Sequence, residues 1–296
     1  MQNDALPARP GPAGGMRRVV GAVRLVHPFP VGAVVLTSAL LVVVAHRGNP
    51  GLFFLTRAAL VVLLSQISVG SLNDYLDRDL DRRVQPEKPI PSGVILPGTA
   101  LFISLASMVA LVPMAATFGT VAFALTVLGT AAGLLYDLWL KPTPFSWVSY
   151  LVGFMSLVTW IWVIAGHLTS AFLLAYPAGL LLVLVAHLAQ SFPDIESDRE
   201  TNQLGPAARL GPSLTFSAIV VGLACATIGA LATGLVWRSV PGILLDSFGV
   251  ALTIRIASLR RFALTSRRAR LTVFHLAAPA VAVTAVGALL AAAAHA

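Results

Sequence analysis

The sequence predicts an all-α, polytopic membrane protein of about nine transmembrane helices, and three observations support this fold class. Of the 296 residues, 57% are hydrophobic and only 11% are charged, whereas soluble domains are about 25% charged. The mean hydropathy is +0.86. The apolar residues form long continuous runs, which are typical of membrane helices, rather than the ~10-residue alternating strands of a membrane barrel.

Nine apolar runs qualify as spans, because crossing about 30 Å of hydrocarbon takes ~20 mostly apolar residues. The third run is the shortest and stops before Pro113. In chain order the predicted spans run from Pro28 to Ala45, Leu52 to Leu72, Ala100 to Leu111, Ala115 to Leu135, Trp147 to Ala165, Ala171 to Gln190, Pro212 to Val236, Val240 to Ile256 and Leu271 to Ala294.

The segment before the first span is polar and rich in Gly, Pro and Arg. It lacks the ~7–15-residue apolar stretch of a signal peptide. We therefore expect residues 1–20 to form a disordered cytoplasmic tail and residues 21–296 to form one nine-helix membrane domain. Cys225 is the only cysteine and lies in an apolar run, which excludes a disulfide framework and a cysteine-based metal site.

The basic residues predict the orientation of the spans. Seventeen of the 20 Lys and Arg residues lie in the N-terminal segment and in the loops after spans two, four, six and eight, against three in the opposite loops. By the positive-inside rule, the N-terminus and the polar loops face the cytoplasm of a cell membrane and the C-terminus lies outside. The net charge of +8 then reflects topology and contact with anionic lipid rather than nucleic-acid binding.

The acidic residues are concentrated on the same side. Acids contribute little to orientation, so their clustering needs another explanation. Ten of the twelve lie in three predicted cytoplasmic segments: Asp74, Asp77, Asp79, Asp81 and Glu87, then Asp137, then Asp194, Glu196, Asp198 and Glu200.

The first acidic segment follows span two without a helix breaker. If the helix continues, Asn73, Asp77 and Asp81 share one face because they recur every four residues, and Asp74 lies beside them. Such like charges repel one another, and a divalent cation relieves the repulsion. Magnesium prefers carboxylate and phosphate oxygens, and the lack of nearby His or Cys argues against zinc.

The second acidic segment lies just beyond span six. Asp194 and Asp198 are again four residues apart, and Pro193 suits a first helical turn. Two carboxylate faces at the cytoplasmic ends of separate helices predict a site that holds metal ions and one diphosphate between them. The alternative is a pair of solvated helix ends, with salt bridges to neighbours such as Arg78 and Arg82.

Two lysines fit a diphosphate site. Lys88 lies in the stiff segment Glu87-Lys88-Pro89-Ile90-Pro91-Ser92-Gly93, and Lys141 follows Tyr136 and Asp137 after span four. Lysine and arginine bind phosphate and stabilise leaving-group charge. The alternative for both lysines is a purely topological role.

These motifs resemble those of the UbiA superfamily of intramembrane prenyltransferases. The family's Asn-x-x-x-Asp-x-x-x-Asp motif is matched by Asn73, Asp77 and Asp81, and its Asp-x-x-x-Asp motif by Asp194 and Asp198. A basic Pro-Ile-Pro-Ser-Gly stretch is matched by residues 88–93. The sequence departs from the family in three places: Tyr136 and Lys141 are five rather than four residues apart, His27-Pro28 replaces Arg-Pro, and Lys88 replaces the commoner Arg.

The resemblance implies magnesium-dependent transfer of an isoprenyl group from an allylic prenyl diphosphate to a small acceptor. The diphosphate would leave, and the acceptor would attack the allylic carbocation within the apolar helices. We expect Asn73, Asp74, Asp77, Asp81, Asp194 and Asp198 to bind metal, with the last two of each motif, Asp77, Asp81, Asp194 and Asp198, as catalytic residues. We expect the diphosphate to contact Lys88, Lys141, Arg199, Arg78 and Tyr136.

Several readings of the acceptor stay open. An aromatic ring, as in quinone synthesis, is the first; a lipid alcohol or a terpene cyclisation without an acceptor is the second. A transporter is disfavoured because its acids would lie near the bilayer midplane. No obligate protein partner is predicted. The sequence leaves open the donor chain length, the oligomeric state, and the roles of His27-Pro28 and of Asp246 in the eighth span.

Overall fold

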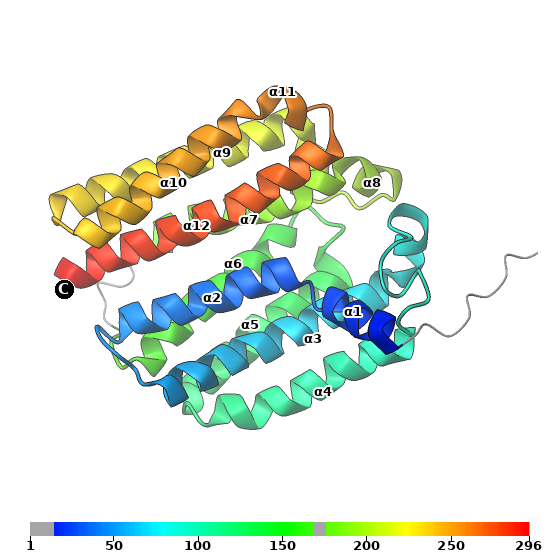
Figure 1. The fold of residues 1–296 in the computed structure, drawn as a ribbon, viewed down its shortest axis with the longest axis horizontal. Coiled ribbons are helices and arrows are strands. Elements are labelled where there is room, and N and C mark those ends of the chain that lie inside the picture. The colour runs from blue at the N-terminus through cyan, green and yellow to red at the C-terminus, as the bar shows by residue number, and fades with distance from the viewer. Residues whose placement is uncertain (1–14, 169–175, 296) are drawn as a thin grey trace, which may run out of the picture.

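The computed structural model describes residues 15–168 and 176–295. Within these ranges there are nine helices that are long and apolar enough to cross a membrane, and there is no strand. The predicted all-α class with nine spans is confirmed. Figure 1 shows that the long helices run roughly along one direction.

The helices follow the predicted order, with short elements added between the spans. In chain order they are α1 (Gly15–Leu25), α2 (Pro28–Ala45), α3 (Leu52–Val84), α4 (Pro97–Ala116), α5 (Thr120–Leu135), a π-helical turn η1 (Tyr136–Leu140), α6 (Ser146–Ile164), α7 (Tyr176–Ser191), a 3₁₀ turn η3 (Phe192–Asp194), α8 (Ile195–Glu200), α9 (Pro206–Val236), α10 (Val240–Ser258), α11 (Arg260–Ala263) and α12 (Arg267–His295).

Several helix boundaries differ from the predicted ones, and α5 begins at Thr120 rather than at Ala115. The predicted end of the third span at Leu111 is wrong, because α4 continues through Pro113 to Ala116. An internal proline removes only the one backbone hydrogen bond that its missing N–H would donate, and transmembrane helices tolerate this loss. The seventh helix, α9, begins at Pro206, before the predicted start at Pro212, and has a break at Gly211, whose φ of 77° is open to glycine but strained for other residues. The predicted start of the sixth span, residues 171–175, lies outside the described residues.

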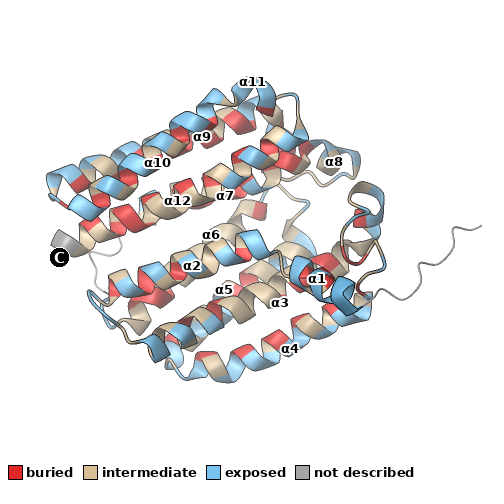
Figure 2. Ribbon diagram, viewed as in Figure 1, coloured by how far each residue is buried: buried red, intermediate tan, exposed pale blue. Residues whose placement is uncertain are grey.

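The long helices form two groups that pack against each other, with α2 beside α12. In Figure 1, α7, α9, α10 and α12 lie together, and α2 to α6 lie on the other side. The connections that carry the acidic and basic motifs, including η1, α8 and α11, gather at the end opposite the C-terminus. Figure 2 shows buried residues between the helices and exposed ones facing outward. Many outward residues are apolar, such as Phe102 and Val109 on α4, as a lipid-facing surface requires.

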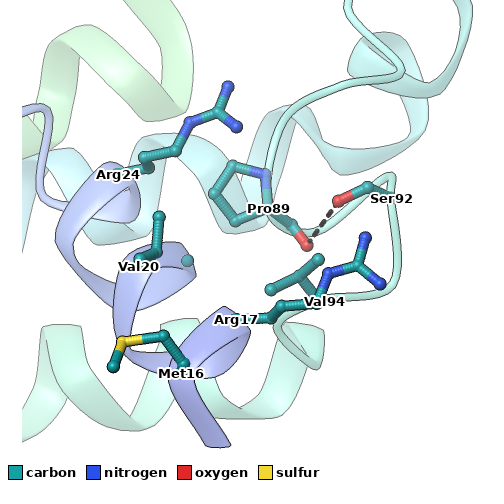
Figure 3. Close-up of a pocket in the computed structure, with 8 residues that line it drawn as sticks. Met16, Arg17, Val20, Arg24, Pro89, Ser92 and Val94 are labelled. Carbon is teal, nitrogen blue, oxygen red and sulfur yellow. Dashed lines mark hydrogen bonds between the residues drawn. The ribbon is translucent and has the colours of Figure 1, made fainter. Parts of the chain in front are cut away.

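The first helix corrects the predicted tail. Residues 15–20 belong to α1 rather than to a disordered segment, while residues 1–14 lie outside the described residues. Leu25 is fully buried, and a Cβ added at Gly21 would lie 2.6 Å from Val94. Figure 3 shows Arg17 and Arg24 of α1 beside Pro89 and Ser92 in the loop after α3, where Ser92 Oγ donates to the Pro89 carbonyl at 3.3 Å. Packing on this loop orders α1.

Candidate active site

The two acidic motifs face one cavity of about 510 Å³ at the motif-bearing end of the bundle. Cavities of this size are typical of small-ligand sites. Its wall comes from α2, α3, α5, η1, α6, α12 and the segment that runs from α7 into α8. The five motif residues that line it are Asn73, Asp77, Asp81, Asp194 and Asp198.

The face of α3 that lines the cavity is the predicted one, because α3 continues unbroken to Val84. Asn73, Asp77 and Asp81 therefore lie one turn apart along the wall. Asp74 does not line the cavity. It is only 2% exposed, and its Oδ1 lies 3.2 Å from His27 Nε2.

Lys88 contacts both the cavity-lining Asp81 and the buried Asp74 of α3. Its Nζ donates to Asp81 Oδ2 at 2.9 Å and to Asp74 Oδ1 at 3.4 Å, and it lines the cavity. Burial alone lowers the pKa of a lysine, but the Asp74 and Asp81 carboxylates outweigh burial and raise the pKa of Lys88 above its ordinary value. Lys88 is therefore charged at neutral pH.

Lys141 contacts the cavity-lining face of the same helix. Its Nζ donates to Asn73 Oδ1 at 3.0 Å and to the Asp77 carboxylate. Burial by itself would lower the pKa of Lys141, as for Lys88. The Asp77 carboxylate outweighs burial here, so the pKa of Lys141 is raised. Close packing of α5 on α3 makes this contact: a Cβ at Gly133 would lie 2.8 Å from Val69.

The five-residue spacing of Tyr136 and Lys141 is explained by the π-helical turn between them. The backbone N–H of Lys141 donates to the Tyr136 carbonyl at 2.9 Å, an i→i+5 hydrogen bond. In such a turn, residues five apart take the relative places of residues four apart in an α-helix. Both side chains accordingly line the cavity.

The second acidic motif closes the cavity opposite α3. The chain passes from α7 through η3 into α8, so that Asp194 and Asp198 both face inward. Arg267 at the start of α12 donates to Asp194 Oδ1 at 2.8 Å. Arg267 lies in the predicted basic loop after span eight, and no spacing signal in the sequence links it to Asp194, which lies 73 residues away.

Two predicted diphosphate contacts lie elsewhere. Arg78 donates to the Tyr75 carbonyl at 2.7 Å and lies over the Tyr75 ring. Arg199 donates to the Ala208 carbonyl at 2.6 Å, and its guanidinium packs against Gly211. Neither arginine lines the cavity, so the structure does not bring these two residues to the site.

Other cavity residues were not predicted. Asp137 lines the wall, and its buried Oδ2 has no hydrogen-bond partner among the described residues. Its place in the third acidic segment was the only sequence signal for it. The Tyr150 ring lies against the Tyr136 ring, with centroids 5.3 Å apart, and against His187, with centroids 4.4 Å apart. These rings form an aromatic wall below the charged groups.

The donor set fits magnesium bound together with a phosphate. All the inward motif side chains offer oxygen, as Mg²⁺ prefers. Among the described residues no three acidic, His or Cys side chains form a cluster that would hold a metal ion by themselves. Magnesium often takes only one or two carboxylates and completes its shell with waters and substrate phosphates. The paired Lys and Arg side chains supply the positive charge that a diphosphate requires.

The chain resembles known proteins over most of its length. The sequence model of the UbiA prenyltransferase family matches residues 33–278. The digeranylgeranylglyceryl phosphate synthase of Pyrococcus abyssi is 33% identical over 102 residues, 34% of this chain and 37% of that protein. The protoheme IX farnesyltransferase of Salinispora tropica is 34% identical over 139 residues, 43% of this chain and 42% of that protein. The matched stretches thus span less than half of these relatives.

Solved structures share the fold. An apo UbiA homolog from Aeropyrum pernix has a TM-score of 0.67 at 20% identity, covering 84% of this chain and 94% of that one. A UbiA homolog from Archaeoglobus fulgidus bound to DMAPP and Mg²⁺ has a TM-score of 0.62 at 17% identity, covering 88% of this chain and 98% of that one.

Proposed function

The chain belongs to the UbiA prenyltransferase family, and from this premise we propose that it transfers an isoprenyl group from an allylic prenyl diphosphate to a small acceptor, with magnesium as its divalent cation. One observation carries the proposal: two carboxylate motifs and two charged lysines line the polar end of a single cavity whose other end is apolar. A diphosphate with a hydrocarbon tail has this same polarity.

Five residues would hold the metal: Asn73, Asp77, Asp81, Asp194 and Asp198. An A. fulgidus homolog bound to DMAPP and Mg²⁺ supports the choice of ion. Bound magnesium would supply Lewis-acid stabilisation of the leaving diphosphate. Asp74 has a different role in this proposal, because it pairs with His27 and Lys88 behind the wall. It positions Lys88.

Three cations would bind the diphosphate: Lys88 and Lys141, which line the cavity, and Arg267, which does not line it but pairs with the cavity-lining Asp194. Each pairs with a motif carboxylate. Each would exchange that contact for a phosphate oxygen when the prenyl diphosphate binds together with magnesium. The Tyr136 side chain lines the same end of the cavity and completes the set. Arg78 and Arg199 are not part of it.

Ionisation would break the bond between C1 of the donor and its phosphate oxygen. The electron pair leaves with the diphosphate, whose charge the lysines offset. The allylic cation remains beside the rings of Tyr136 and Tyr150, which attract cations through their faces. The acceptor attacks C1 and releases a proton, and the cavity-lining Asp137, whose buried Oδ2 has no hydrogen-bond partner among the described residues, would take it.

An aromatic acceptor is the first candidate. A lipid alcohol is the second, and the matches to digeranylgeranylglyceryl phosphate synthases favour it. The bias of 17 to 3 basic residues places the cavity mouth on the cytoplasmic side of a cell membrane in this proposal, with the C-terminus outside. The motif-bearing end is also the end with the basic loops (Figure 1).

The proposal is tested with the purified full-length protein, magnesium and radiolabelled allylic diphosphates. Hydroxybenzoate, dihydroxynaphthoate, homogentisate and glycerol phosphate serve as acceptors, and each donor is also incubated alone. We expect magnesium-dependent diphosphate release and a labelled product with one acceptor class. A labelled cyclic product formed without any acceptor would show that the reaction is cyclisation rather than transfer. No release and no metal-dependent donor binding would refute the enzyme.

A further inference from the structure

The apolar end of the cavity stops at the indole of Trp160. This residue lies on α6, lines the cavity and is only 2% exposed. Its ring packs edge-on against Phe118, with centroids 5.5 Å apart, and Phe118 packs in the same way against Phe54 at 5.4 Å. The three aromatic rings come from different parts of the chain and close this end. A buried ring packed edge-on in this way is a rigid floor.

Two helices give the distance from the polar end of the cavity to this floor. From Asn73 to Val61, which lines the deep end from α3, twelve residues rise about 18 Å. From Tyr150 to Trp160 on α6, ten residues rise about 15 Å. The two values agree, so the apolar part of the cavity is about 15–18 Å deep.

This depth corresponds to a definite number of isoprene units. Three bonds of an extended polypeptide span at most about 3.6 Å, so the four main-chain bonds of an isoprene unit span about 5 Å. Three units therefore fill about 15 Å, whereas four units span about 20 Å and would extend past the floor. Taking the proposed function as its basis, we propose that Trp160 limits the donor to three isoprene units, so that a farnesyl-length diphosphate is preferred.

The wall along this path is compatible with hydrocarbon. The two mid-depth hydroxyls of Ser65 and Thr130 satisfy each other at 2.8 Å, and Thr126 donates to the Ala122 carbonyl at 3.0 Å. Leu157 lies one turn above Trp160 on the same face of α6. Apart from the Gln66 amide and the Trp160 indole N–H, which has no hydrogen-bond partner among the described residues, the path presents carbon or paired polar atoms to the tail.

The competing route for a longer tail lies between α2 and α12. Val31 and Phe274 line the cavity there, close to its charged end. Aromatic contacts narrow this side: Phe29 packs edge-on against Phe274, with centroids 5.7 Å apart, and against His275 at 4.6 Å. A tail that left by this route would bypass Trp160, and chain length would then have no limit set by the floor.

Binding of unreactive donor analogues separates the two routes without an acceptor. Thiolo-diphosphates with two, three, four and eight isoprene units compete with labelled geranyl diphosphate for the purified full-length protein in magnesium. We expect the three-unit analogue to bind best, and the four- and eight-unit analogues to bind at least about tenfold more weakly, as overpacking of a closed apolar end requires.

Three variants then move or keep the floor. Trp160→Ala should shift the optimum to four units, and Leu157→Phe, which raises the floor by three residues or about 4.5 Å, should shift it to two units. Trp162→Ala is the matched control, because Trp162 is on the same helix but does not line the cavity. The control should keep the three-unit optimum.

The outcomes divide cleanly. If the eight-unit analogue binds the wild type as well as the three-unit one, or neither cavity variant changes the optimum, the floor is overturned while the proposed function stands. If no diphosphate binds in a magnesium-dependent way, the proposed function itself fails. If Trp160→Ala does not fold, the shift of Leu157→Phe toward two units decides the question.

Discussion

The backbone N–H of Lys141 donates to the carbonyl of Tyr136 at 2.9 Å and closes a π-helical turn at the end of α5. Because of this turn, a five-residue spacing brings both side chains to the cavity, and Lys141 reaches Asn73 and Asp77. Single π-turns within helices are rare and are frequent at functional sites. The hydrogen bond between Lys141 and Tyr136 therefore predicts how the site responds to adding or removing one residue in this turn.

Deleting Leu138, a 45% exposed residue of the turn, should convert it to an ordinary helical turn with the four-residue spacing and keep donor binding. Inserting one Ala after Leu138 should rotate Lys141 away from Asp77 and lower kcat/KM by about 100-fold, because positioning errors of this kind are costly in catalysis. Steady-state kinetics on the two variants provides the measurement. Equal loss in both would show that the register of the turn is not what matters.

The two acidic motifs should be required for metal-dependent activity. Asp77→Ala and Asp194→Ala should each lower kcat/KM by about 100-fold or more, because a metal site that loses a carboxylate loses affinity and charge neutralisation. Asp79→Ala is the control, since Asp79 is exposed and pairs with Arg82 away from the cavity. Kinetics over a magnesium titration and a membrane-insertion assay measure the effect. Full activity of both cavity variants would refute the metal assignment.

Substitution of a cation in the cavity should impair the reaction, whereas substitution of a predicted diphosphate contact that lies outside the cavity should not. Lys141→Ala should raise the donor KM and lower kcat, by about tenfold or more, because it removes a buried charge from the diphosphate. Arg78→Ala should change neither, because Arg78 packs on Tyr75 outside the cavity. Donor-concentration curves at saturating magnesium compare the two. A larger effect for Arg78 would restore the assignment made from the sequence.

The pH dependence of donor binding follows from the lysines. The carboxylates raise the pKa values of Lys88 and Lys141 above the ordinary 10.5. Their ion pairs therefore contribute fully below that ordinary value and are lost only as the pH rises through the raised folded pKa. Donor affinity measured between pH 7 and 9 should show no fall from lysine deprotonation in the wild type, and Lys88→Arg should keep this plateau. A fall with a midpoint in this range that Lys88→Arg removes would contradict the assignment.

The far end of the bundle makes a stability prediction. Asp246 on α10 is fully buried, and neither carboxylate oxygen has a hydrogen-bond partner among the described residues. A Cβ at Gly287 on α12 would lie 2.3 Å from Asp246 Oδ1. Gly287→Ala should therefore destabilise the protein by about 1–3 kcal/mol through overpacking. Thermal unfolding in detergent measures this, and the second change Asp246→Ala should restore much of the loss.

Gly229→Ala serves as the matched control for that pair, because nothing lies within 4 Å of an added Cβ there. It should leave the unfolding temperature unchanged or raise it slightly, since alanine is the better helix former. Equal destabilisation by Gly229→Ala and Gly287→Ala would show that the contact with Asp246 is not the cause.

Local spacing predicted the cavity face of α3 but not the fate of Asp74. Residues four apart on an unbroken helix share a face, and this holds for Asn73, Asp77 and Asp81. The side chain of Asp74 points away from this face, because Asp74 is offset by one residue from Asn73. Its partners there, His27 and Lys88, come from other segments of the chain. The order of residues 15–20 depends in the same way on the loop at Val94 that covers Gly21.

The sequence by itself determined the fold class, the nine spans and the motifs, because hydropathy and helical periodicity are properties of neighbouring residues. Only the tertiary structure decided which charges meet. Arg267 reaches Asp194 across 73 residues, whereas Arg199, one residue from Asp198, turns away to Ala208. The depth of the cavity down to Trp160 is likewise a product of several packed helices. Contacts between distant segments depend on how whole helices pack, and no local pattern encodes them.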